Sequence, residues 1–192
     1  AVRGGCGGMD ARESRQYVSA LLMAACRACE PVEIIVKSLT SSPYLDLTLD
    51  ALSRFGAAID RPGEDRFWVR PQSLASQGVR VEGDYSAASY PASAAALTEG
   101  RVLLEGLLQH SKQGDRRFID LLEQLGARAE WTDSGLEISG CFKKSIDVDL
   151  SAMPDQVPTL AALAPFLPGT TTIRNVAHLR FKESDRLATV EP

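Results

Sequence analysis

Side chains that bind metal ions are scarce in this sequence. Its 192 residues include two histidines and four cysteines, and the CxxC pair formed by Cys26 and Cys29 has no second pair to complete a zinc site. The pair also continues the small-residue segment ALLMAACRAC, whose spacing is typical of a packed helix, so packing explains it better than redox or metal chemistry. We therefore expect neither a metal site nor a metal cofactor.

An excess of basic residues and long apolar segments are also missing. The formal net charge is −4 and the pI is about 5.3, which argues against a general nucleic-acid or membrane-surface binder but leaves room for a local basic pocket. No segment approaches the ~18 apolar residues of a membrane span. The start AVRGGCGGMDAR has no apolar core of the secretory type. We expect a cytoplasmic protein with no nucleic-acid or membrane partner.

What the sequence does contain is a repeat. With 44% hydrophobic and 24% charged residues, it has the balance of a soluble globular protein. The aliphatic segments VEIIVKSL, RVLLEGLL and TTTIRNVA begin at residues 32, 101 and 170, each 69 residues after the one before. Their composition predicts strands, and a small-residue segment that predicts a helix precedes each one, at 17–25, 86–97 and 157–166. This order favours an α/β layered architecture.

A second helix is predicted after the polar loop of the first two repeats. The segments TLDALSRFG and FIDLLEQLG both end in glycine followed by alanine, a helix C-cap signal, and both lead into an extended stretch. The first repeat lacks a clean opening strand. In the third repeat, RLATVEP begins the second helix where the sequence stops, so we expect a segment of a longer protein.

A domain boundary is expected near QGVRVEGD, residues 77–84, where the first repeat ends and the second begins. This boundary would divide the chain into two partial domains, residues 1–81 and 82–192. A single continuous domain of three repeats is the alternative, and the pattern does not choose between them.

Polar residues stand at the start of all three first helices, as SRQ at 14–16, DYS at 84–86 and PDQ at 154–156. Capping explains them, because serine or aspartate at an N-cap stabilises a helix by roughly 1 kcal/mol. An anion site explains them too, because a helix N-terminus carries unpaired N–H groups and partial positive charge. For each helix taken alone, capping is the favoured interpretation.

The segment HLRFKESDR, residues 178–186, shifts the balance towards an anion site. It places three cations within seven residues, around Glu183 and Asp185. Arginine can grip a phosphate or carboxylate through two hydrogen bonds, and the two acids can hold the cations or move a proton. Asp155 begins the preceding helix of the same repeat, so both can face one crevice. From charge alone, a solvated charged turn is still the simpler interpretation.

Taken together, five segments resemble the 5-enolpyruvylshikimate-3-phosphate synthase family (3-phosphoshikimate 1-carboxyvinyltransferases). They span nearly the whole chain in the family's order: ESRQYVSALLMAA, SSPYLDLTL, VEGDYSAASY, MPDQVPTLA and HLRFKESDRLA. The resemblance implies the inside-out α/β barrel fold of the enolpyruvyl transferases, with repeated βαβαββ units and two partial domains here. It places the crossing between the domains just before VEGD and makes residues 1–81 the part that binds shikimate 3-phosphate.

The resemblance also implies a reaction. The family transfers the enolpyruvyl group of phosphoenolpyruvate to the 5-hydroxyl of shikimate 3-phosphate and releases phosphate, a step of the shikimate pathway towards chorismate and the aromatic amino acids. It needs no metal or organic cofactor. The expected partners are therefore these two small anions, and the full-length protein is expected to be a monomer.

Roles carry over residue by residue. Asp155 matches the base for the 5-hydroxyl, and Glu183 matches the acid that protonates the phosphoenolpyruvate methylene. The residues matching the shikimate 3-phosphate site are Ser14, Gln16, Ser41, Tyr44, Asp155, His178 and Lys182. Those matching the phosphoenolpyruvate site are Gln16 and Arg186.

The sequence also departs from the family. Arg15 stands where the family has a second serine, and either pairs with the phosphate or blocks the pocket. The N-terminal Lys-Ser segment, its glycine-rich loop and the C-terminal arginine and lysine are missing, so the chain alone is expected to be inactive or nearly so. Two alternatives stay open: a non-catalytic remnant that binds a phosphate ligand weakly, and a UDP-N-acetylglucosamine enolpyruvyl transferase, against which KESDR and SSPY argue.

Overall fold

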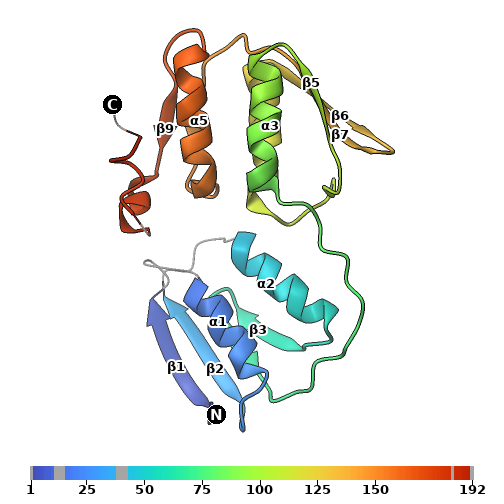
Figure 1. The fold of residues 1–192 in the computed structure, drawn as a ribbon. Coiled ribbons are helices and arrows are strands. Elements are labelled where there is room, and N and C mark those ends of the chain that lie inside the picture. Colours follow the sequence, from blue (N-terminus) through green and yellow to red (C-terminus); the bar gives the residue numbers. More distant parts are fainter. Residues whose placement is uncertain (1, 11–15, 38–42, 183, 191–192) are drawn as a thin grey trace. The chain divides into compact units, whose positions relative to one another are not determined.

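The structure is a computed structural model that describes residues 2–10, 16–37, 43–182 and 184–190. The chain divides into two compact units, Ala1–Arg80 and Val81–Pro192 (Figure 1). That these two units are partial domains of a larger enzyme is still a prediction.

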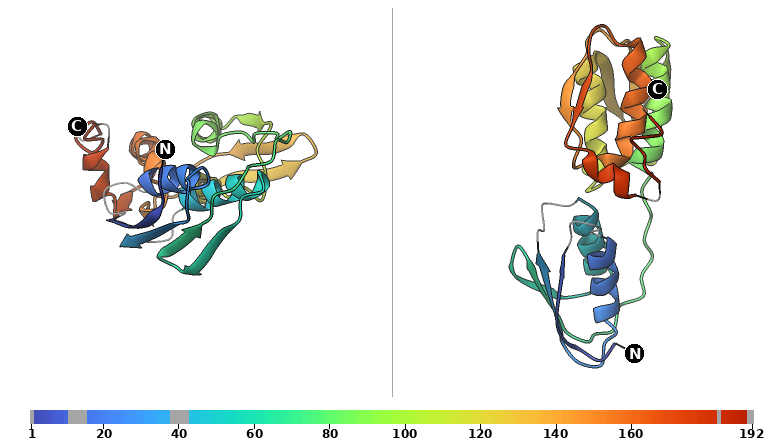
Figure 2. Two further views of the ribbon diagram at one scale, coloured as in Figure 1. Left: turned by 90° about the horizontal axis from the view of Figure 1, so that it is seen from below. Right: turned by 90° about the vertical axis from the view of Figure 1, so that its left-hand side faces the viewer.

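In its described residues, the first unit is a four-stranded sheet with two helices. The strands β1 (Gly5–Asp10), β2 (Val32–Lys37), β3 (Ile59–Gly63) and β4 (Arg66–Val69) lie in the order β1-β2-β4-β3. The β1 and β2 strands are parallel, and the other neighbouring pairs are antiparallel. The helices α1 (Gln16–Ala25) and α2 (Pro43–Arg54) lie on one face of the sheet (Figure 2).

The core of the first unit lies between this sheet and its helices. Strand side chains alternate between the two faces, so Ile34 and Phe67 are buried while Glu33 and Trp68 lie on the opposite face. Cys26 is fully buried in the same core, which agrees with packing as the role of this cysteine. The buried core residues are Val18, Leu22, Ala25, Cys26, Ile34, Val36, Leu45, Leu52, Phe67 and Val69.

The second unit contains, in the part that the structure describes, two sheets and three α-helices. The strands β5 (Arg101–Leu104), β6 (Ala127–Thr132) and β7 (Gly135–Gly140) form an antiparallel sheet in the order β5-β7-β6. The β8 (Asp147–Asp149) and β9 (Thr172–Arg174) strands form a parallel pair. The helices are α3 (Tyr85–Leu97), α4 (Arg117–Leu125) and α5 (Val157–Leu163).

Short 3-10 segments connect these elements: η1 (Gly114–Arg116), η2 (Pro154–Gln156), η3 (Ala164–Phe166) and η4 (Ala177–Phe181). The α3 and α5 helices run side by side (Figure 1). Their apolar faces share one core with α4 and the β5-β7-β6 sheet, in which Phe118, Leu122 and Ile138 are fully buried. Leu179 joins this core and anchors η4. None of the helices in the described segments is long and apolar enough to cross a lipid bilayer.

The repeat elements predicted from the sequence are confirmed. The aliphatic segments form β2, β5 and β9, and the helices before them are α1, α3 and α5. The predicted second helices are α2 and α4. Gly56 and Gly126, just beyond them, have φ angles of 82° and 120°, positive values that favour glycine after a helix end.

Two expectations at the ends of the repeats are wrong. The first repeat does have an opening strand, because the glycine-rich segment GCGGMD forms β1 and pairs along β2. Ladder hydrogen bonds use only the main chain, so a strand need not show an apolar pattern. In the third repeat, residues 186–190 form hydrogen-bonded turns and no α-helix.

Candidate functional site

Four predicted site residues lie in the second unit, at the start of α5 and in the segment after β9. Asp155 is the middle residue of η2, directly before α5. His178 lies in η4 and is half-buried, whereas Lys182 follows η4 and is exposed. Arg186 is half-buried and begins the turns of residues 186–190.

An ion pair joins these two segments. Nη1 of Arg186 donates to Oδ1 of Asp155 at 2.6 Å, and the two side chains are 27% and 35% exposed. This partial burial strengthens the pair relative to a surface pair and still leaves it open to a ligand. The main chain supports the contact, because the N–H of Arg186 donates to the carbonyl of the buried Leu179. The structure thus brings Asp155 and Arg186 together.

Asp185 organises the same segment. Its Oδ1 accepts hydrogen bonds from the N–H groups of Leu187 and Ala188, both at 3.1 Å, and its Oδ2 accepts one from Arg180 at 3.0 Å. The N–H of Ala188, and then the Arg180 guanidinium, lower the pKa of Asp185. This acid therefore caps the turn and holds a cation.

Gln16 and Tyr44 lie in the first unit. Gln16 begins α1 and is exposed, while Tyr44 is the second residue of α2 and is half-buried. The hydroxyl of Thr48 lies 2.8 Å from that of Ser19 and 3.0 Å from the main-chain carbonyl of Tyr44. This contact joins α1 to α2 near their N-terminal ends, so Gln16 and Tyr44 lie at neighbouring helix starts.

Several predicted positions lie outside the described residues, namely Ser14, Arg15, Ser41 and Glu183. Their roles stay predictions from the sequence. Among the residues that are described, no group of three or more His, Cys, Asp and Glu side chains could hold a metal ion.

Sequence reasoning missed a buried polar cluster beside Asp155. Asp115, in η1 before α4, is 4% exposed and accepts a hydrogen bond from the hydroxyl of Ser86. Gln156 follows Asp155 in η2 and is fully buried. Asp84 caps α3 by accepting the N–H of Ser86 at 2.8 Å, which bears out capping for this helix. The starts of α3, α4 and α5 therefore meet at this cluster.

Burial is the largest cause of a raised pKa at Asp115. The hydrogen bond from Ser86 and the nearby amide of Gln156 lower this pKa, whereas the negative charges of Asp155 and Asp84 raise it further. In the sequence, this residue sits in the polar loop QHSKQGDR before an amphipathic helix. The available signal was an acid at a helix start, which is also typical of a cap.

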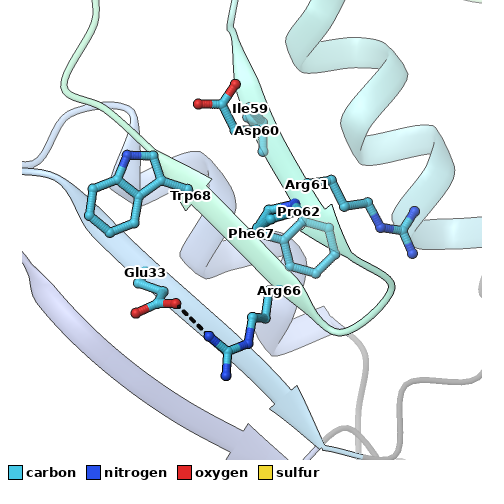
Figure 3. Close-up of a pocket in the computed structure, with 8 residues that line it drawn as sticks. All are labelled: Glu33, Ile59, Asp60, Arg61, Pro62, Arg66, Phe67 and Trp68. Atoms are coloured by element: carbon cyan, nitrogen blue, oxygen red, sulfur yellow. Dashed lines mark hydrogen bonds and ion pairs between the residues drawn. The ribbon is translucent and has the colours of Figure 1, made fainter.

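A surface hollow of about 620 Å³ lies on the sheet of the first unit, away from α1 and α2 (Figure 3). It is lined by Glu33, Ile59, Asp60, Arg61, Pro62, Arg66, Phe67 and Trp68. The Nη1 of Arg66 contacts Glu33 at 3.2 Å, so charges here are partly paired across strands. A second hollow of about 450 Å³ lies on the β5-β7-β6 sheet. Neither hollow is lined by a predicted site residue.

Comparison with known proteins gives one consistent family. The family model described as EPSP synthase (3-phosphoshikimate 1-carboxyvinyltransferase) matches residues 5–191. The 3-phosphoshikimate 1-carboxyvinyltransferase of Methanoculleus marisnigri is 47% identical over 190 residues, which cover 97% of this chain and 45% of that protein. The enzyme of that name from Syntrophobacter fumaroxidans is 45% identical over 185 residues, covering 95% and 44%. The chain thus spans less than half the length of these relatives.

Solved structures agree on the fold. The EPSP synthase of Acinetobacter baumannii superposes with a TM-score of 0.76 at 25% identity, over 98% of this chain and 44% of that one. The enolpyruvyl transferase NikO of Streptomyces tendae, at 20% identity, has a TM-score of 0.62 over 91% of this chain and 45% of its own. These matches confirm the enolpyruvyl transferase fold expected from the sequence.

Proposed function

Because this chain belongs to the EPSP synthase family, we propose that it supplies part of the machinery that transfers the enolpyruvyl group of phosphoenolpyruvate to the 5-hydroxyl of shikimate 3-phosphate. The transfer forms a C–O bond between the 5-oxygen and C2 of phosphoenolpyruvate and breaks the bond between C2 and the phosphate oxygen, so that phosphate leaves and the hydroxyl proton is given up; any proton added to the methylene carbon must be lost again to restore the double bond. It is a step of the shikimate pathway towards chorismate and the aromatic amino acids. The pair formed by Asp155 and Arg186 at the start of α5 carries this proposal.

The two members of this pair have complementary chemistry. The carboxylate of Asp155 can accept hydrogen bonds from ring hydroxyls and take the proton of the attacking 5-hydroxyl. The guanidinium of Arg186 has five N–H donors in a fixed plane, so it can hold Asp155 and still donate to a phosphate or carboxylate. We therefore assign Asp155 as the base and Arg186 to phosphoenolpyruvate.

The remaining site residues are assigned by their side-chain chemistry and by their match to the family's motifs. Lys182 is exposed and His178 half-buried in the segment that carries Arg186, and we assign both to shikimate 3-phosphate. In the first unit, Gln16 and Tyr44 are proposed to contact the same substrate. Glu183, Ser14 and Ser41 complete the proposal on sequence grounds, with Glu183 as the acid and the serines on shikimate 3-phosphate.

Full turnover needs more donors than the described residues present. Stabilising a transition state requires charged groups arranged together around the reacting atoms. Since the chain spans 45% of the Methanoculleus relative, we propose that it binds shikimate 3-phosphate but turns over slowly or not at all alone. The ligands are two soluble anions and the net charge is −4, so we propose a cytoplasmic protein with no nucleic-acid or membrane partner. That the full-length protein is a monomer is proposed from the family resemblance alone.

Calorimetric titration of the chain with shikimate 3-phosphate tests this function, with shikimate as the ligand control. We expect saturable binding that requires the phosphate. Lys182→Gln and Asp155→Asn should each weaken it by roughly tenfold, as expected when a hydrogen bond to a charged group is lost. Arg174→Gln is the matched control, because this exposed arginine pairs with Asp147 instead.

The outcome also separates the proposal from a non-catalytic remnant. If the folded chain and its Arg15→Ser variant both fail to bind shikimate 3-phosphate, the assigned pocket is wrong for this chain. Binding by Arg15→Ser alone would show that the arginine blocks a pocket that is otherwise intact.

A further inference from the structure

Asp115 is a buried acid that the proposed reaction does not use. It is 4% exposed, and the charged groups facing it are Asp84 from before α3 and Asp155 from η2. Arg186 neutralises Asp155 at 2.6 Å. A buried carboxyl group beside two other acids is unfavourable unless its contacts offset the lost hydration. The burial of this acid in η1 therefore needs a structural or functional explanation.

The contacts of Asp115 reach the starts of two other helices. Its Oδ2 accepts the hydroxyl proton of Ser86 in the first turn of α3. Gln156, directly after Asp155, is fully buried. The Gln156 amide is close enough to Asp115 to favour its ionised form. A buried carboxyl group thus bonds to Ser86 at the start of α3 and senses the charge of Asp155.

Several buried polar atoms in this cluster have no hydrogen-bond partner among the described residues. Oδ1 of Asp115 and both amide atoms of Gln156 are buried, and none of them reaches hydrogen-bonding geometry with a described residue. Buried polar atoms in folded proteins are nearly always paired, because an unpaired one costs roughly 1–3 kcal/mol. Such atoms on Asp115 and on Gln156, the chain neighbour of Asp155, are typical of a site arranged for a task other than core packing.

We propose that Asp115 is a positioning residue, whose carboxyl group holds Ser86 at the start of α3, the helix that packs against η2, and thereby keeps Asp155 where it meets a hydroxyl group of the ligand. Asp115 acts on Asp155 through α3 and through its own charge, and does not touch the ligand itself. The proposal rests on the proposed function, in which Asp155 is the base.

The charges in the cluster support this arrangement. Two carboxyl groups that face each other do not ionise independently, and the more buried one takes up a proton first. Asp115 is buried whereas Asp155 is half-buried beside Arg186, and burial followed by the charge of Asp155 raises the pKa of Asp115. The cluster therefore favours the protonated form of Asp115 more than an exposed site would.

The first test measures shikimate 3-phosphate affinity by calorimetry on the complete 192-residue chain. Asp115→Asn keeps the shape of the side chain and removes its charge, and we expect about tenfold weaker binding with no loss of thermal stability. Asp120→Asn, an exposed acid on α4, the helix that follows η1, is the matched control and should bind like the unchanged chain. If Asp115→Asn also binds like the unchanged chain, Asp115 only fills space and the proposal is overturned.

The second test needs no ligand and leaves Asp115 in place. Carboxyl carbon NMR gives the pKa of Asp115 in the unchanged chain and in Asp155→Asn. We expect this pKa to fall in the variant, because the facing negative charge is gone. An unchanged pKa would overturn the proposal. If the unchanged chain binds no shikimate 3-phosphate, the proposed function fails for this chain, and the NMR titration still tests separately whether Asp115 faces Asp155, as the positioning role requires.

Discussion

Replacing Tyr85 with phenylalanine tests how the start of α3 is held. The side chain is 1% exposed, and its hydroxyl donates to the carbonyl of Leu108 at 2.8 Å. A hydrogen bond of this kind contributes about 1 kcal/mol net. Leu108 is 49% exposed, so water can reach its carbonyl once the phenol is gone. We therefore expect Tyr85→Phe to lower the free energy of unfolding of the second unit by about 1 kcal/mol at pH 7.

The effect should reverse at high pH. Burial raises the pKa of Tyr85 to about 12, against about 10 in the unfolded chain, with Arg116 opposing the shift. Folding thus favours the neutral phenol, and this stabilisation is complete below pH 10 and lost as the pH rises through 12. The two pKa values correspond to at most about 2.7 kcal/mol. Since phenylalanine does not ionise, Tyr85→Phe should become the more stable protein near pH 12.

The assay is denaturant unfolding from pH 7 to pH 12, followed by Trp131 fluorescence in a Trp68→Phe background so that only the second unit is seen. Comparing proteins at each pH cancels the other groups that titrate in this range. Tyr90→Phe is the control, because Tyr90 lies on the same helix and is 61% exposed. A constant difference between Tyr85→Phe and its parent at every pH would refute the reasoning.

Two further predictions concern packing and backbone. Leu122→Ala should destabilise the second unit, and Leu22→Ala the first, by about 2–5 kcal/mol each, because both side chains are fully buried. Hydrogen exchange should show each loss confined to its own unit; equal loss in both units would contradict separate cores. Gly126→Ala should cost more than about 2 kcal/mol, because φ is 120° and the new Cβ would lie 2.8 Å from the Cys141 carbonyl. In thermal melts, Gly7→Ala, whose Cβ meets nothing within 4 Å, should change far less.

The elements with strong local patterns could be predicted from the sequence. Aliphatic runs with β-branched residues became β2, β5 and β9, and Gly56 and Gly126 marked where α2 and α4 end. β1 could not be found this way, because it is held by main-chain pairing to β2 and carries almost no apolar side chains. The 3-10 segments could not be predicted either, because they are too short to give a periodic sequence pattern.

The candidate site, too, could be predicted from the sequence only in part. A motif placed Asp155 and Arg186 in one repeat, but the 2.6 Å contact between them depends on how η4 and the following turns return to α5. Asp115 was not singled out, and Gln156 was named only among the polar residues at the helix starts, because each resembles an ordinary polar residue at such a place. Only packing shows that their side chains are buried beside Asp155. Burial of this kind depends on contacts between distant segments, which a single sequence pattern does not contain.

The measurement that tests the central claim most directly is an NMR titration of the isotope-labelled chain with shikimate 3-phosphate. The claim is that the start of α5 and the segment after β9 form the site. We expect saturable shifts at residues 155–156 and 178–187, and smaller ones with shikimate. Shifts centred on the first unit's hollow around Arg66 and Trp68, or no shifts from a folded chain, would contradict the account.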